Sequence, residues 1–209
     1  SLPVSAALTE LTILGNPLTG GKPKYIGNDK YRQTDGEDIS GVSVLFPSAT
    51  NIIKLNVSDT GLGPSSMPEL TKLVSNPSAA LTSLTIAQND IGERGGTALV
   101  ETLKSSNMQS IVIGKDLRLI IRGELESASL DASNQDISPG YAIIMAWWLT
   151  LPVSAALTSL TLDKNGIFGE LYPNGRVKTP DKHAAEAQPF FDAIKASGLT
   201  SLSLSGTGM

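Results

Sequence analysis

Few side chains in this sequence have the types and spacing that catalysis requires. His183 is the only histidine, and with Asp181 close by it could belong to a hydrolase only if one of the nearby serines joined them. No local signature of a nucleophilic serine, such as Gly-x-Ser-x-Gly, is present. We therefore predict a non-catalytic protein that uses no cofactor.

Two further short motifs could bind a metal ion or carry a glycan. Residues 163–166, Asp-Lys-Asn-Gly, resemble part of a calcium-binding loop, but the alternating oxygen ligands and the closing glutamate are missing. We interpret them as the turn that follows a strand, and we predict no metal site. Asn56-Val57-Ser58 matches the N-glycosylation sequon. A strand is a poor place for a glycan, and whether Asn56 is glycosylated stays open.

Composition limits the classes of partner. The net charge is -4, whereas a general nucleic-acid binder would be basic. The chain has no cysteine, so disulfides and thiolate sites are excluded. The most apolar stretch, residues 141–153, is too short to span a bilayer, and the start shows no signal peptide. We expect no nucleic acid and no membrane insertion. The sequence leaves the cellular compartment open, and the lack of cysteines and of a visible signal peptide favours an intracellular one.

Two segments are rich in glycine, proline, asparagine and charge, and we predict both as insertion loops, at about 20–37 and 169–182. Both contain the aromatic and cationic side chains that protein interfaces favour. The candidate partner-binding residues are Lys22, Lys24, Tyr25, Lys30, Tyr31 and Arg32 in the first segment and Tyr172, Arg176 and Lys178 in the second. The alternative is that both are tolerated, solvated insertions without a role.

Trp147 is a further candidate for partner binding. A helix is expected at 139–150, in which Trp148 falls on a core position and Trp147 beside Met145 on the outward side. An outward tryptophan is unusual on a solvated surface. Either Trp147 is exposed and binds a partner, or residues 149–156 fold back and cover it.

The elements that must position these residues follow from residues 81–103. Leu81, Leu84 and Ile86 alternate with polar residues as in a short strand with one buried side, and Asn89 comes where the chain must bend. Ala98, Leu99 and Leu103 then mark one face of a helix. A single strand and helix cannot bury this apolar surface, so such a unit must stack on copies of itself.

Variant copies occur along the whole chain. Their first apolar positions are Leu8, Ile52, Leu81, Met108, Leu125, Leu157 and Leu199. This pattern resembles the leucine-rich repeat family, of the ribonuclease-inhibitor-like type. The resemblance implies an α/β solenoid, or horseshoe, with a parallel β-sheet on the concave side and helices on the convex side. We expect one domain of about seven repeats over residues 1–209, as a segment of a longer array because both ends fall within a unit.

Helices are expected at about 39–46, 65–75, 93–106, 139–150 and 183–197, and residues 115–124 as extended or irregular chain. Antiparallel pairing between consecutive units would contradict this fold. The two insertions would project from the same edge, five strand steps or about 24 Å apart along a continuous sheet.

The outward strand positions are mostly serine and threonine, without aromatic or arginine anchors. The leading hypothesis is a protein-interaction scaffold with a protein partner and an open oligomeric state. The alternative is a recognition module for a small molecule, glycan or ice-like surface, which would use the insertions or the Ser/Thr-rich face.

Overall fold

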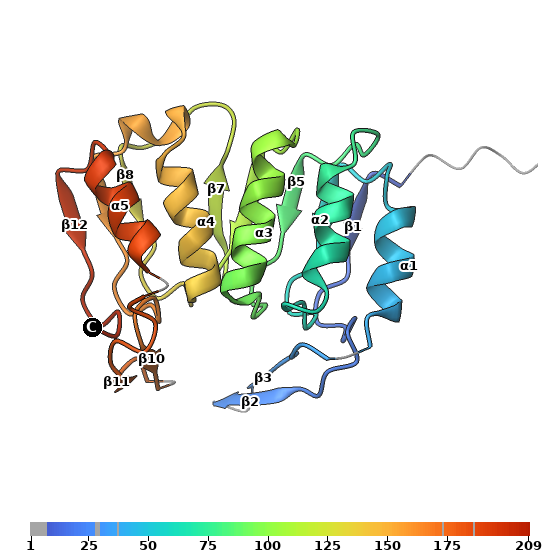
Figure 1. The fold of residues 1–209 in the computed structure, drawn as a ribbon, viewed down its shortest axis with the longest axis horizontal. Helices are drawn as coiled ribbons and strands as arrows, with labels where there is room; N and C mark the ends of the chain where they lie inside the picture. The colour runs from blue at the N-terminus through green and yellow to red at the C-terminus, as the bar shows by residue number, and fades with distance from the viewer. Residues whose placement is uncertain (1–7, 28–29, 37, 173, 186) are drawn as a thin grey trace, which may run out of the picture.

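A computed structural model describes residues 8–27, 30–36, 38–172, 174–185 and 187–209, which form a mixed α/β fold. Figure 1 shows the α-helices side by side in one layer, with the strands of the main sheets behind them. The helices are α1 (Ser40–Ser48), α2 (Met67–Ser75), α3 (Gly92–Ser105), α4 (Pro139–Leu149), the short 3-10 helix η1 (Pro152–Ala156) and α5 (Gln188–Ala196). All five expected α-helices are present. The last one starts five residues later than expected, at Gln188 and not at His183.

Seven short strands pair in parallel within two groups, and a helix follows each strand of a group except the last. The first group is β1 (Glu10–Thr12), β4 (Lys54–Asn56), β5 (Ser83–Thr85) and β6 (Ser110–Ile113); the second is β8 (Ser129–Asp131), β9 (Ser159–Thr161) and β12 (Ser201–Ser203). The central residue of each strand aligns with that of its neighbour, as Leu55 does with Leu84. Six of the seven expected strands lie where the sequence placed them, and the parallel pairing within each group is confirmed, but the expectation of one continuous sheet is wrong.

The interruption is β7 (Leu117–Ile120), which forms an antiparallel hairpin with β6. Leu117 and Leu119 are buried whereas Arg118 is exposed, so this segment has the period of two that a half-buried strand requires. The antiparallel pair lies inside the fourth unit rather than between consecutive units. Residues 115–124, which we expected to be extended or irregular, therefore include the strand β7. This strand ends the first sheet.

The strand of the fifth unit lies two residues later than the sequence alignment placed it. Leu130 pairs with Leu160, so Ser127 occupies the first apolar place of the unit, and Leu125 does not. Ala132, which is fully buried, takes the third apolar place. A weak pattern of leucine, serine and alanine allowed both alignments, and pairing with β9 selected one.

The asparagine after β5 completes the bend of its own unit and of the unit before it. The Asn89 side-chain amide donates to the carbonyls of Val57 (2.8 Å) and Ile86 (3.0 Å). Its oxygen accepts the backbone N–H groups of Thr60 and Leu62, each at 3.0 Å. These bonds satisfy backbone groups that no strand reaches, as the sequence predicted.

Asn165 repeats this arrangement in the sixth unit. Its amide donates to the carbonyls of Ala132 and Leu162, both at 2.8 Å. Its oxygen accepts the N–H groups of Gln135 (2.9 Å) and Ile137 (3.0 Å). Each asparagine therefore links two adjacent units at their bends.

The fourth unit has no helix, so α3 and α4 of the flanking units pack directly against each other. A Cβ on Gly96 would lie 2.3 Å from the carbonyl oxygen of Gly140, and a Cβ on Gly140 would lie 2.3 Å from that of Gly92. Glycine at these positions lets α3 and α4 touch backbone to backbone, although β7 separates the sheets behind them. The buried face of α3 includes Gly96 and Leu99, whereas Ala98, which we expected in the core, is exposed.

Candidate functional site

The first insertion is a β-hairpin and not the loop that we expected. Its strands are β2 (Lys24–Gly27) and β3 (Lys30–Arg32), paired antiparallel. Tyr25 and Tyr31 face each other across the pair, edge to face, with ring centroids 5.5 Å apart. Their side chains are 55% and 62% exposed. Cross-strand aromatic pairs stabilise a hairpin, and this one presents its rings to solvent.

The chain on both sides of the hairpin is bound to the bends of the second unit. Thr19 donates its hydroxyl to the carbonyl of Gly61 at 2.9 Å, and Asp59 accepts the N–H of Gln33 at 2.7 Å. Asp35 accepts both the hydroxyl (2.5 Å) and the N–H (3.1 Å) of Ser65. The base of the first insertion is therefore part of the fold rather than a solvated loop.

Arg32 connects this hairpin to a distant part of the chain. Its guanidinium donates to the carboxylate of Asp136, 104 residues later, at 3.0 Å. Lys115 lies 3.8 Å from the same carboxylate. Arg32 is half-buried, so it does not point freely toward a partner, unlike Lys22, Lys24 and the two tyrosines. The sequence indicated only that Arg32 is a cation within an insertion. No neighbouring residue indicated that its side chain bonds to Asp136.

A cleft of about 490 Å³ lies between the hairpin segment and the ends of the units that it crosses. Its lining combines both signs of charge, neutral polar groups and a few apolar side chains. The lining residues are Lys24, Ile26, Arg32, Gln33, Thr34, Asp35, Pro64, Gln88, Asn89, Asp90, Gly92, Asp136, Ser138 and Tyr141. Clefts of this size are within the range of small-molecule sites.

Three buried polar atoms in this lining have no hydrogen-bond partner within the described part of the chain: Arg32 Nε, Gln33 Oε1 and Ser138 Oγ. Buried polar groups are normally paired, and each orphan requires an explanation. Sequence reasoning did not find this cleft, because its residues come from segments up to about a hundred positions apart.

Tyr141 forms part of the cleft and serves the fold. Its hydroxyl donates to the carbonyl of Ile86 at 2.6 Å and accepts the N–H of Asn89 at 3.1 Å. Burial raises the pKa of the Tyr141 phenol far above its ordinary value, although the bond from Asn89 opposes this shift. The hydroxyl stays protonated and bridges two backbone groups.

The second insertion also contains a hairpin, β10 (Glu170–Leu171) with β11 (Val177–Thr179). Lys182 and then Lys178, both bonded to the Glu170 carboxylate, lower the pKa of Glu170 to about 2. Lys178 is therefore used within the hairpin, with its Nζ 3.3 Å from the carboxylate. Tyr172, 51% exposed, and the exposed Arg176 lie at the turn and remain available.

Both hairpins lie along the same edge of the molecule, as expected, at the bottom of Figure 1. The five strand steps that we assumed between them are wrong, since β7 interrupts the sheet. Trp147 is not at this edge: Ser138 and Tyr141 place the start of α4 at the cleft, and Trp147 lies near the other end of that helix. Trp147 is half-buried against the core, and Met145, expected to be outward, is fully buried.

The outward face of the strands carries an arginine that the sequence analysis did not place there. Arg118 of β7 lies opposite Val112 and donates to the hydroxyl of Ser110 at 3.3 Å. Glu10 and Lys54 form an ion pair of 2.7 Å across β1 and β4. The alternation in residues 117–120 could have revealed Arg118. With the interruption at β7, this face is not a uniform Ser/Thr array.

Residues from the motifs considered for a metal ion or a glycan have side-chain partners within the fold. His183 donates its backbone N–H to Phe168, and the described residues include no cluster of three or more His, Cys, Asp or Glu side chains suited to a metal ion. Asp163 accepts the hydroxyl of Ser203 at 2.6 Å, consistent with a turn after a strand. Asn56 accepts both the N–H and the hydroxyl of Ser58, which is 2% exposed.

No protein-family model matches the sequence, and a comparison with curated proteins finds no significant match. No helix in the described part of the chain is both long and apolar enough to cross a lipid bilayer.

Proposed function

We propose that this protein is a non-catalytic interaction scaffold of the leucine-rich-repeat type, in which one domain of about seven stacked units holds a protein partner. The parallel strand pairs and the asparagine bonds that link adjacent units support the repeat interpretation. Under this proposal the strand–helix units form the rigid support, and the insertions at one edge form the recognition surface.

The observation that carries this proposal is the set of exposed aromatic side chains on the two hairpins. Tyr25, Tyr31 and Tyr172 are each more than half exposed. The exposed Arg176 lies on the second hairpin. Tyrosine and arginine are over-represented among residues that dominate binding energy. These tyrosines and Arg176 lie along one edge of the molecule. The side chains on the outward face of the neighbouring strands are mostly small and polar.

Point substitutions test the surface better than deletions, because the base of the first hairpin is bonded to the fold. We would prepare Tyr25→Ser with Tyr31→Ser as one variant and Tyr172→Ser with Arg176→Ala as another. The control is Val44→Ser, since Val44 is 72% exposed and belongs to α1 rather than to either hairpin. Proteins captured from native extract by the wild type would be identified, and their affinity for each variant measured.

The proposal expects each hairpin variant to weaken binding by at least about tenfold, or ~1.4 kcal/mol, with an unchanged melting temperature. The Val44→Ser control should bind as the wild type does. Unchanged binding by both hairpin variants would place the recognition surface elsewhere.

The cleft beneath the first hairpin favours a second candidate function, recognition of a small neutral ligand. The three unpartnered atoms comprise an N–H donor, a carbonyl acceptor and a hydroxyl that can do both. Asp35, Asp90 and Asp136 disfavour an anion, and Lys24 and Arg32 disfavour a cation. A sugar or polyol, whose hydroxyls donate and accept, matches this lining after a small displacement of the hairpin.

Two serines that precede helices provide a matched test. Ser138 precedes α4, and its hydroxyl has no partner among the described residues, whereas Ser66 precedes α2 and donates its hydroxyl to Gly63 at 3.0 Å. Binding would be measured by calorimetry against glucose, mannose, galactose, N-acetylglucosamine and myo-inositol. Ser138→Ala should weaken sugar binding without loss of stability. Ser66→Ala should lower the stability of the fold without weakening sugar binding. Equal binding by wild type and Ser138→Ala, or none by either, would contradict this candidate.

A further inference from the structure

The sequence contains two Asn-Gly pairs, Asn165-Gly166 and Asn174-Gly175. An asparagine followed by glycine is chemically labile, because the backbone nitrogen of the glycine can attack the side-chain carbonyl carbon of the asparagine. Glycine has no side chain to hinder this approach. The surroundings of each pair in the folded chain decide whether the reaction occurs, and the two pairs differ in those surroundings.

Asn165 is protected from this reaction. Its side chain is fully buried, and its Nδ2 donates to the carbonyls of Ala132 and Leu162. Release of this nitrogen would break bonds that link the fifth and sixth units. The water that completes the reaction also has no access to a fully buried group.

Asn174 lies in the turn between β10 and β11 and is exposed. Its Oδ1 accepts the backbone N–H of Arg176 at 3.1 Å. This bond holds the side chain over the turn and polarises the carbonyl that the glycine nitrogen attacks. A hydrogen-bond donor at that oxygen also stabilises the negative charge that develops on it during the attack.

Gly175 has the space that the reaction requires. A Cβ on Gly175 would meet no atom within 4 Å, whereas a Cβ on Gly166 would lie 3.3 Å from the carbonyl oxygen of Gly169. The Gly175 N–H donates to the carbonyl of Tyr172 at 2.8 Å, so this bond must open before the nitrogen attacks. It belongs to an exposed turn, where local opening costs little free energy.

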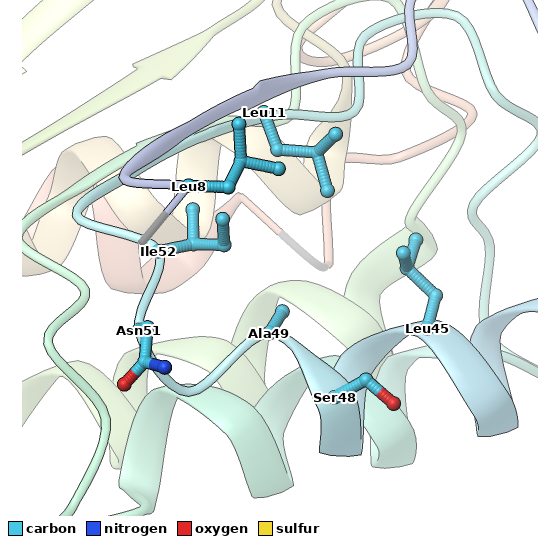
Figure 2. A pocket seen from close by; sticks show the side chains of 7 residues that line it. All are labelled: Leu8, Leu11, Leu45, Ser48, Ala49, Asn51 and Ile52. Carbon is cyan, nitrogen blue, oxygen red and sulfur yellow. The ribbon is translucent and has the colours of Figure 1, made fainter. Parts of the chain in front are cut away.

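Exposure alone does not make an asparagine labile, as Asn51 illustrates. Asn51 is exposed after the end of α1. Figure 2 shows it beside Ile52, whose side chain lies with Leu8 and Leu11 around a hollow of about 190 Å³. Ile52 is branched at Cβ, which crowds its backbone nitrogen and hinders an attack on Asn51. Asn51 is therefore an exposed control within the same chain.

We propose that Asn174 is a site of spontaneous modification, at which the neutral side-chain amide is converted to a carboxylate. The Gly175 nitrogen forms a bond to Cγ of Asn174, its proton and the Asn174 amide nitrogen leave together as ammonia, and a cyclic imide results. One water molecule then opens the ring at either carbonyl, which leaves an aspartate or an isoaspartate at this position. The reaction requires no oxidant, reductant or enzyme.

The product changes the surface of the second hairpin. Tyr172 and Arg176 lie on either side of Asn174, and the N–H of Tyr172 donates to the carbonyl of Arg176 at 2.8 Å across the turn. The new carboxylate adds a negative charge beside the exposed Arg176, and an isoaspartate also lengthens the main chain of the turn by one methylene group. This consequence rests on the interaction scaffold proposed above: modification should weaken binding of the partner at this hairpin, because it opposes the charge that the partner accommodates.

The test is to incubate the purified chain at neutral pH and physiological temperature and to follow each asparagine by peptide mapping with mass spectrometry. Conversion of an amide raises the mass of its peptide and releases an equal amount of ammonia. In the folded chain the Asn174 peptide should convert more than about tenfold faster than the Asn165 peptide, because Asn165 reacts only when its bend opens. The Asn51 peptide should stay unchanged. In urea Asn165 should convert about as fast as Asn174.

Asn174→Gln is the matched variant. It keeps an exposed amide, but its longer side chain forms the imide ring poorly, so position 174 should stay unmodified. Two results would overturn the proposal: an Asn174 peptide that converts in urea but not in the folded chain, or equal conversion of Asn165 and Asn174 in the folded chain.

The effect on binding is measured separately, with fresh wild type, incubated wild type and incubated Asn174→Gln. Incubated wild type should bind the captured partner at least about threefold more weakly than the other two. If Asn174 converts without loss of affinity while Tyr172→Ser with Arg176→Ala weakens binding, the effect on binding is refuted and the scaffold stands. If the hairpin variants themselves bind unchanged, the scaffold is refuted, and the mass measurement alone decides the modification.

Discussion

Replacing Asn89 by alanine tests whether the asparagine bonds hold adjacent units together. Asn89 is 3% exposed, and its oxygen is the hydrogen-bond partner of the backbone N–H groups of Thr60 and Leu62. The carbonyls that its amide contacts keep other donors: Val57 accepts the Thr60 hydroxyl, and Ile86 accepts the Tyr141 hydroxyl. The main loss is therefore two buried N–H groups without partners.

Each buried N–H without a partner costs about 1–3 kcal/mol, so the loss of two partners in Asn89→Ala should lower the free energy of unfolding by roughly 2–6 kcal/mol. Asn16 is a matched control at the same place in the first unit. It is exposed, and its amide donates to Ile13 and Leu14 with longer distances of 3.3 Å. Because water can replace these bonds, Asn16→Ala should cost less than about 1 kcal/mol.

Urea unfolding at 25 °C, followed by far-UV circular dichroism and tryptophan fluorescence, measures both variants. The midpoint shifts convert to free energies through the slope of each transition. Equal destabilisation by Asn89→Ala and Asn16→Ala would refute the reasoning, because it would show that burial of the bonded bend contributes nothing.

Three further changes probe other contacts. Gly140→Ala would place a Cβ 2.3 Å from the Gly92 oxygen, so thermal unfolding should show a loss of about 1–3 kcal/mol as the helices separate. Tyr141→Phe removes a buried hydroxyl that bridges two backbone groups, and urea unfolding should show a loss of about 1–3 kcal/mol. The pKa of Glu170, lowered from 4.5 to about 2, means that its ion pairs with Lys182 and Lys178 stabilise the fold above pH 4.5 and are lost as the pH falls toward 2. Stability measured over that pH range should fall less steeply for Glu170→Gln; identical slopes would contradict this assignment.

Part of the candidate site followed from residue types alone. Tyr25, Tyr31 and Tyr172 were predicted at one edge from their place after a strand, and all three are exposed on hairpins there. Arg32 shows the limit of this reasoning: its sequence context suggested a partner contact, but its guanidinium bonds to Asp136 inside the fold. Residue type indicates what a side chain can bind, and only the tertiary contacts decide what it does bind.

The sequence by itself determined the local elements. Apolar residues with a period of two, such as Leu84 and Ile86, specify strands, and Asn89 specifies the bend, because these features depend on residues close together in the sequence. Only the tertiary structure decided that β7 interrupts the sheet, that Leu130 rather than Ala128 packs against the core, and that a cleft forms beneath the first hairpin. Those outcomes depend on which distant segments compete for the same hydrogen bonds and the same buried volume, and no local pattern encodes that competition.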